Sequence, residues 1–171
     1  MEIKEEMVDV VDENDMVVGS APRKGIHKTD KLHRSVHIFL INSSGRIWLE
    51  KRAENTDTFP GYYNSSAAGH VSSGESYEEG ALREIEEELG IKNANIKKMH
   101  KLAASKETSN EFVTFFIVHS DEKPTINKDA TDALNSYSIK EIDEMIAKGN
   151  KFVPIFMKLY NWHKINAANS H

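Results

Sequence analysis

Cysteine is absent from the 171 residues of the sequence, so a disulfide framework, a thiol nucleophile and a thiolate metal site are all excluded. The sequence also lacks any run near the roughly 18 apolar residues of a membrane span, and its acidic segment Met1 to Val11 lacks the apolar core of a signal peptide. A basic surplus is missing as well, because the formal net charge is −5. We therefore expect a cytoplasmic protein with neither a membrane nor a nucleic-acid polymer as its partner.

The remaining composition is that of an ordinary globular protein, with 39% hydrophobic and 29% charged residues. A chain of this length buries about 70% of its unfolded surface, which is enough for one substantial core. The sequence shows no internal repeat, no low-complexity tract and no linker rich in proline, glycine or serine. These features predict a single domain over residues 1–171.

Strand-like and helix-like segments are mixed along the chain. Because strands outnumber helices, the mixture favours an α+β fold or a layered α/β/α sandwich over a doubly wound parallel sheet. The strongest hairpin signal lies in residues 35–53, with its turn at 42–45. The other expected elements are a hairpin at 7–23, a loop-like stretch at 58–76, a buried strand at 111–120 and helices at 138–149 and 152–168.

One further helix is signalled at both of its ends. Ser76 and Glu79 have the spacing of a capping box, and Gly90 follows the last apolar position, so the helix is expected from about Tyr77 to Leu89. Its apolar residues fall on one stripe, which should face the core. The stripe consists of Ala81, Leu82, Ile85 and Leu89.

The segment REIEEELG, residues 83–90, concentrates negative charge on this helix. Glu84, Glu87 and Glu88 share a second stripe, and like charges at this spacing repel by about 0.2–0.5 kcal/mol per pair. The helix dipole adds to the cost, since it prefers cations near the C-terminus. A bound Mg²⁺ or Mn²⁺ would offset the repulsion, because these ions accept carboxylate oxygens. The alternative is a solvated helix face in which Arg83 pairs with Glu87.

The acidic helix belongs to a longer motif that begins at Gly69. Five residues separate Gly69 from Glu75, and seven residues separate Glu75 from the triplet Arg83-Glu84-Ile85. One residue then separates this triplet from the pair Glu87-Glu88, and one more separates that pair from Gly90-Ile91. All nine specified positions in these 23 residues match, so the chain resembles the Nudix hydrolase superfamily. The resemblance implies that family's α/β/α sandwich with a mixed sheet. It also implies hydrolysis of the diphosphate linkage in a small, nucleoside diphosphate-type substrate.

The resemblance implies a role for each residue of the motif. Glu84, Glu87 and Glu88 would bind Mg²⁺ or Mn²⁺, and Glu84 or Glu87 would also accept the proton of the attacking water. Arg83 would take part in catalysis by orienting Glu84 through a charge-assisted hydrogen bond. Structural roles fall to Gly69, Glu75 and Gly90. Outside the motif, the candidate catalytic acids are Glu111 and, in reserve, Glu107.

Segments around the motif resemble one branch of the superfamily, the isopentenyl-diphosphate isomerase-like proteins. The resemblance rests on VDVVDENDMVVG, HKTDKLHRSVHIFLIN and FPGYYNSSAAGHV, within residues 7–91. Isomerases of that branch hold a second metal with histidines and glutamates. His33 and His70 match two of those ligands, and Glu111 matches the branch's catalytic glutamate. His27 is one residue short in its spacing and Ser109 replaces an acid, so we expect an eroded second site.

The branch's catalytic cysteine is replaced here by Ala68, which removes one of the two groups that isomerisation needs. We therefore expect a hydrolase on an isomerase-like frame, with a small-molecule diphosphate as its substrate and a monomer or homodimer as its state. Isopentenyl-diphosphate isomerase is one alternative and a non-catalytic ligand sensor is another, although intact Glu84, Glu87 and Glu88 argue against a sensor. His37 and His119 are expected to be ordinary strand histidines.

Overall fold

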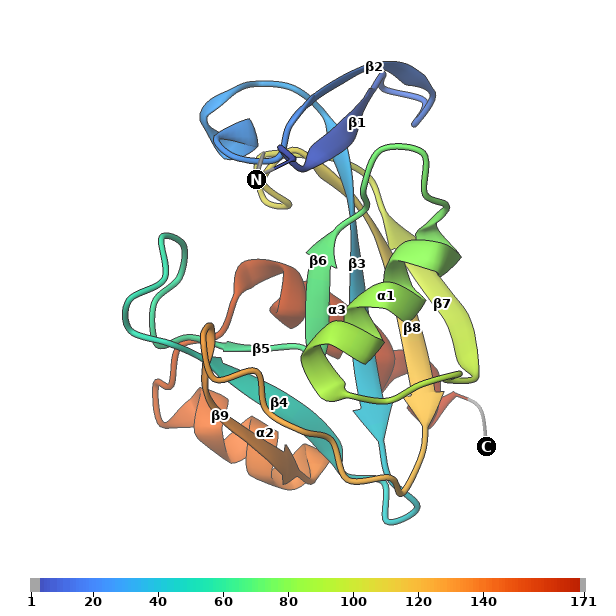
Figure 1. The fold of residues 1–171 in the computed structure, drawn as a ribbon. Helices are drawn as coiled ribbons and strands as arrows, with labels where there is room; N and C mark the ends of the chain where they lie inside the picture. Colours follow the sequence, from blue (N-terminus) through green and yellow to red (C-terminus); the bar gives the residue numbers. More distant parts are fainter. Residues whose placement is uncertain (1–3, 170–171) are drawn as a thin grey trace.

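A seven-stranded mixed sheet forms the centre of the computed structural model, which describes residues 4–169 (Figure 1). Helix α1 (Tyr77–Leu89) covers one face of the sheet and helix α3 (Pro154–Ala168) covers the other, which confirms the α/β/α sandwich. None of the helices within the described residues is both long and apolar enough to span a membrane. The other elements are β1 (Met7–Val11), β2 (Val17–Pro22), the 3-10 helix η1 (Ile26–Lys28), β3 (His33–Ile41), β4 (Ile47–Arg52), β5 (Tyr63–Asn64), β6 (Ala67–His70), β7 (Ile96–Leu102), β8 (Glu111–His119), β9 (Thr131–Tyr137) and α2 (Ile139–Ala147).

The central strands β3 and β8 run parallel and pair along their whole length, starting with His33 opposite Glu111. Strand β6 pairs antiparallel with β3 and places His70 opposite Ser35. The sheet order is β5-β4-β3-β8-β7, with β9 paired to β4. His33, His70 and Glu111 are therefore neighbours at one end of the sheet, although they lie far apart in the sequence.

The alternation of side chains along β3 supplies two separate cores. Ile38 belongs to the core beneath α1, together with Ile85. Phe39 belongs to the core beneath α3, where its ring lies 5.5 Å from that of Phe156. Because successive side chains of a strand point to opposite faces, His37 lies on the same face as Phe39.

The β1–β2 hairpin forms a separate two-stranded sheet at the end of the molecule where His33 lies (Figure 1). Its turn residue Asp15 has a φ of 60° and holds the hairpin to three other elements. The Asp15 carboxylate accepts hydrogen bonds from Arg34 Nε at 2.6 Å, from the Tyr77 hydroxyl at 2.7 Å and from the Lys101 ammonium group. The hairpin is thereby fixed against β3, α1 and β7.

The structure corrects several expectations about local structure. Strands β3 and β4 share only the pair Ile41–Ile47, because β6 and β8 occupy the two edges of β3 and β4 pairs with β9 instead. The stretch 58–76, expected to be a loop, contains β5 and β6. Leu82 was wrongly placed in the core and is 39% exposed. The helix at 77–89 is confirmed to the residue, with both halves of its capping box formed.

Candidate functional site

Helix α1 presents the motif acids beside strand β6. The helix starts at the Ser76–Glu79 capping box and ends at Gly90, which has a φ of 69° and caps the last turn in the left-handed conformation. Between these ends Glu84 is buried, whereas the Glu87 side chain is 58% exposed. The helix therefore directs Glu84 inward and Glu87 toward solvent.

Arg83 is the hub of the motif. Its Nε donates to Glu75 Oε1 at 2.7 Å, and its Nη1 donates to Glu84 Oε1 at 2.8 Å. Nη1 also reaches Glu87 Oε2 at 3.3 Å, while Nη2 donates to the His70 carbonyl oxygen at 3.0 Å. One guanidinium group thus joins the loop before the helix, the end of β6 and two of the helix glutamates. This is the contact between Arg83 and Glu84 that the sequence predicts.

The Glu84 carboxylate packs against β6 at Gly69, where the absence of a side chain leaves room for it. A Cβ atom added to Gly69 would stand 2.2 Å from a Glu84 carboxylate oxygen, far inside van der Waals contact. Glycine is required here by close approach, since Gly69 has no left-handed φ.

Glu88 is held by the neighbouring residue of the same strand, whose backbone N–H, that of Ala68, donates to Glu88 Oε2 at 3.1 Å. Burial, with Glu84 and Glu50 nearby, raises the pKa of Glu88 well above its ordinary value. Burial also raises the pKa of Glu84, against the opposing effect of Arg83. Two neighbouring carboxyl groups whose pKa values are both raised are the electrostatic setting that a divalent cation would relieve. Among residues 4–169, however, these three acids do not form a group of potential ligand atoms close enough together to hold a metal ion. The metal role of Glu84, Glu87 and Glu88 stays a prediction.

A second cluster, formed by His27, His33, His70 and Glu111, lies on the α3 face of the sheet. One ligand atom from each of these residues lies within 4.8 Å of all the others. Oε1 of Glu111 is 3.0 Å from His70 Nε2, 3.4 Å from His33 Nε2 and 3.6 Å from His27 Nε2. Burial alone would raise the pKa of Glu111, but His33 and His70 hold it well below its ordinary value.

The donor set of this cluster fits a divalent transition metal. His33 Nδ1 lies 3.0 Å from the Lys31 carbonyl oxygen, so Nδ1 carries the proton and Nε2 keeps its lone pair. His33 Nε2 is buried and has no hydrogen-bond partner among the described residues, so it is available to bind a metal ion. Burial lowers the pKa of His27, which keeps its imidazole in the neutral form that binds metals.

The expectation that this second site is eroded is wrong for His27. Its side chain joins the cluster because Gly25, with a φ of 83°, starts the short helix η1 and turns the chain toward β6. His70 Nε2 and His27 Nε2 are 3.1 Å apart. His27 therefore lies in the cluster although its sequence spacing to His33 is one residue short.

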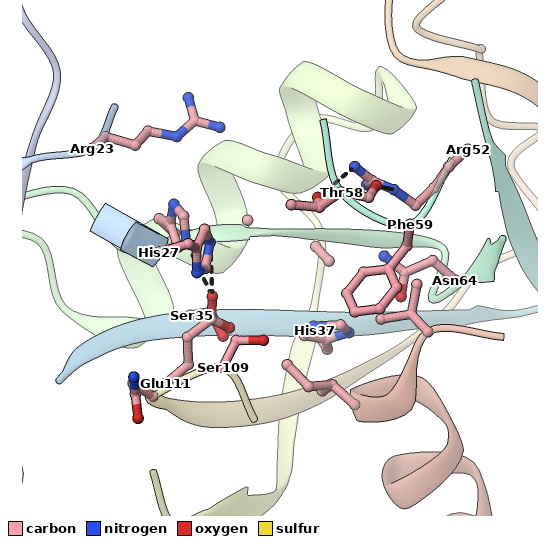
Figure 2. Close-up of a pocket in the computed structure, with 16 residues that line it drawn as sticks. Arg23, His27, Ser35, His37, Arg52, Thr58, Phe59, Asn64, Ser109 and Glu111 are labelled. Carbon is pink, nitrogen blue, oxygen red and sulfur yellow. Dashed lines mark hydrogen bonds and ion pairs between the residues drawn. The ribbon is translucent and has the colours of Figure 1, made fainter. Parts of the chain in front are cut away.

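A cavity of about 530 Å³ adjoins the His27–Glu111 cluster (Figure 2). Ala68 and Gly69 of β6 form part of its wall, and the backbone of the same two residues contacts the helix acids. A wider outer groove of about 1000 Å³ shares part of this lining, including Arg23 and Arg52. Figure 2 shows these two arginines on opposite sides of the view, with His27 and Glu111 below Arg23.

Three cavity-lining residues escaped the sequence-based reasoning: Arg23, His37 and Asn64. His37 was expected to be an ordinary strand histidine, yet the alternation His33, Ser35, His37 places all three on one face of β3. That alternation is the signal that could have found it. His119 is exposed, and the reserve acid Glu107 is exposed and paired with Lys158, outside the cavity lining.

Comparison with known proteins gives a consistent result. A family model described as the NUDIX domain matches residues 31–159. An uncharacterised Nudix hydrolase of Nostoc sp. is 31% identical over 159 residues, which cover 90% of this chain and 93% of that protein. Isopentenyl-diphosphate Delta-isomerase 1 of Photorhabdus laumondii is 32% identical over 161 residues, covering 90% of this chain and 92% of that protein. The crystal structure of DR0079 from Deinococcus radiodurans is similar with a TM-score of 0.81 at 28% identity, covering 91% of this chain and 98% of that one.

Proposed function

This chain belongs to the Nudix family of hydrolases, and from that premise we propose that it cleaves a diphosphate linkage in a small, nucleoside diphosphate-type molecule with the help of Mg²⁺. Hydrolases of this kind act on phosphoric anhydride bonds. The observation that supports the proposal most strongly is the placement of two acids, the buried Glu84 and the half-buried Glu88, against the β6 backbone that also walls the cavity.

Mg²⁺ suits the carboxylate oxygens of Glu84, Glu87 and Glu88, which would hold it. Such an ion would neutralise phosphate charge and make an attacking water more acidic. Arg83 keeps the Glu84 carboxylate oriented through the hydrogen bond at 2.8 Å. Glu84 or Glu87 is then the group that accepts the proton of the water. Glu87 is the more accessible of the two.

The arginines of the cavity supply charge for the phosphates. Arg52 is oriented by Nε donating to the Thr58 carbonyl oxygen at 3.0 Å and by Nη2 donating to the Thr58 hydroxyl at 3.3 Å. Arg23 is paired with the exposed Glu6 at 2.6 Å. Guanidinium groups bind phosphate oxygens in bidentate fashion, so Arg23 and Arg52 would hold the diphosphate from two sides.

The cluster of His27, His33, His70 and Glu111 would hold a second divalent ion. Imidazole ligands select a transition metal such as Zn²⁺ over Mg²⁺. In this assignment Glu111 serves as a ligand, because its Oε1 already lies within 3.6 Å of all three imidazoles.

The similarity to an isopentenyl-diphosphate isomerase and the presence of this cluster favour isomerisation as a second candidate. Ala68 argues against it, since this residue lines the cavity with a methyl group that neither donates nor accepts a proton. Conversion of isopentenyl to dimethylallyl diphosphate at high enzyme concentration is the test. We expect no conversion.

The direct test of the proposed function is a colorimetric phosphate assay over a panel of nucleoside diphosphates, nucleotide sugars and dinucleoside polyphosphates, with a phosphatase added for products that are phosphate esters. Each compound is incubated with and without Mg²⁺. Hydrolysis that needs the cation supports the proposal. Binding of these compounds without turnover of any of them would support a non-catalytic sensor instead.

We also infer that residues 1–171 act as one Nudix domain, although the family match begins at residue 31. The N-terminal hairpin is tied to the rest of the chain through Asp15, and the segment after it supplies Arg23 and His27 to the cavity. Residues 1–3 and 170–171 lie outside the described part. The cytoplasmic location and the monomeric or homodimeric state stay predictions.

A further inference from the structure

The cavity has two chemically different ends. One end carries the cation Arg23 beside His27 and His70, all of which also line the outer groove. The other end, called the inner end, is the part of the cavity lined by His37, Phe59, Asn64, Val153 and Ile155, none of which lines the outer groove. Arg52 adjoins this end beside Phe59 and Asn64. Figure 2 shows Phe59 and Asn64 beside His37, set apart from the end marked by His27 and Glu111.

The two polar groups of the inner end are both oriented by Ser65. His37 Nδ1 lies 2.8 Å from Ser65 Oγ, and Asn64 Oδ1 accepts a hydrogen bond from Ser65 N at 2.8 Å. All three residues are buried, with 4% of His37, 5% of Asn64 and none of Ser65 exposed. Their side chains are therefore fixed before any ligand arrives.

Each of these side chains keeps one polar atom for a ligand. Among the described residues, His37 Nε2 and Asn64 Nδ2 have no hydrogen-bond partner. Both atoms are in contact with solvent and are therefore open to a ligand. Asn64 Nδ2 is a donor. His37 Nε2 is a donor or an acceptor, depending on whether Ser65 donates to Nδ1 or accepts from it. Burial lowers the pKa of His37 to about 4, so the ring is neutral at neutral pH.

Phe59 lies beside these polar groups and has a strained backbone conformation. Its φ of 46° lies in the left-handed region, which a bulky residue rarely adopts. The strain has to be balanced by the surrounding structure, and strained residues of this kind gather at ligand sites. The result is an aromatic face beside two neutral hydrogen-bonding atoms.

We infer that this inner end binds the base of a nucleoside diphosphate, with His37 and Asn64 reading the base edge and Phe59 contacting its ring; the inference rests on the proposed function. A base is flat, uncharged and carries donors and acceptors on its edge, as the site requires. An apolar chain, such as that of an isoprenoid diphosphate, would cover both polar atoms without pairing them. Each unpaired buried group weakens binding by roughly 10- to 100-fold. The inner end therefore selects a base over a hydrocarbon.

The test compares phosphate release from CDP, UDP, ADP and GDP with release from dimethylallyl diphosphate and methyl diphosphate. Two variants alter the site with little change of shape. Asn64→Asp keeps the Oδ1 that accepts from Ser65 but replaces the Nδ2 donor by an acceptor. His37→Asn keeps a polar atom near Ser65 and removes Nε2. Asn95→Asp makes the same chemical change as Asn64→Asp at an exposed position outside the cavity.

We expect kcat/KM for the best nucleoside diphosphate to exceed that for dimethylallyl diphosphate by at least 100-fold. Asn64→Asp and His37→Asn should each reduce this ratio at least 10-fold through a higher KM for the nucleoside diphosphate, whereas Asn95→Asp should leave it unchanged. Equal turnover of all the diphosphates, or a ratio unaffected by both variants, would overturn the inference and leave diphosphate hydrolysis standing.

If the protein hydrolyses none of these compounds, the proposed function fails, and calorimetric titration with the four nucleoside diphosphates decides the inference by itself. Binding that Asn64→Asp weakens at least 10-fold supports a base site on a non-catalytic protein. Absence of binding rejects the base site as well.

Discussion

Gly69 and the Glu84 carboxylate are in such close contact that a single methyl group between them would stand 2.2 Å from the nearest oxygen. The contact joins the first glycine of the sequence motif to Glu84, the first of its three proposed metal ligands, across fifteen positions of the chain. It explains physically why a strand residue and a helix residue occur together in one motif.

Gly69→Ala should displace Glu84 and lower hydrolysis by about 100-fold, because the Cβ and the carboxylate cannot occupy the same space. Overpacking of this kind also destabilises a fold by about 1–3 kcal/mol. Gly19→Ala is the matched control, since a Cβ at Gly19 meets nothing within 4 Å. Turnover and urea denaturation are measured for both variants. Equal behaviour of the two would show that the contact has no functional weight.

His33→Ala should abolish binding of Zn²⁺ at the cluster around Glu111, because His33 Nε2 is buried, makes no hydrogen bond among the described residues and lies 3.4 Å from Glu111 Oε1. Metal content after dialysis and the rise in melting temperature on adding the ion both report on this site. His119→Ala, which removes an exposed histidine, is expected to bind as the parent protein does. Undiminished binding by the His33 variant would remove the cluster from consideration as a metal site.

His37 should make the protein less stable in acid. Burial lowers the pKa of His37 to about 4 in the folded protein, whereas the pKa of a histidine in the unfolded chain is about 6.5. Between these values the unfolded chain binds a proton that the folded chain does not, so the free energy of unfolding decreases as the pH falls from about 6.5 to about 4, by up to roughly 3 kcal/mol. His37→Asn should lose this part of the pH dependence. Urea unfolding at about pH 7 and about pH 5 measures the free energy of unfolding at each pH. The same decrease between the two pH values in the parent protein and in the variant would contradict this role of His37.

Asp15→Ala should loosen the N-terminal hairpin, because it leaves Arg34, Tyr77 and Lys101 without their common acceptor. A loss of about 2 kcal/mol in the free energy of unfolding is expected for hydrogen bonds to a charged group. KM should rise as well, since the hairpin leads directly to Arg23 and His27. Asp132→Asn, at an exposed position, serves as the control. A stable variant with unchanged KM would show that the hairpin is not held by Asp15.

Local signals in the sequence predicted the parts of the fold that local interactions decide. The helix at 77–89 follows from its capping box and terminal glycine. The hydrogen bond between Arg83 and Glu84 was expected only from the resemblance to the Nudix motif, since adjacent side chains on a helix do not face each other. Strand pairing is decided by the whole sheet, so the parallel pairing of His33 with Glu111 and the short strand β6 within an expected loop were beyond local patterns. His27 reaches the cluster through a turn that only Gly25 hints at, and Asn64 reaches the cavity through a strand of two residues.

The most direct test of the account is Mg²⁺-dependent phosphate release by Glu88→Gln compared with Glu86→Gln. Both changes remove one carboxylate from the same helix, but Glu88 lies against Ala68 and Glu86 is exposed. We predict that Glu88→Gln folds normally and loses about 100-fold or more of its kcat, while Glu86→Gln keeps it. Equal activity of the two variants would contradict the central claim that the acids held against β6 perform the hydrolysis.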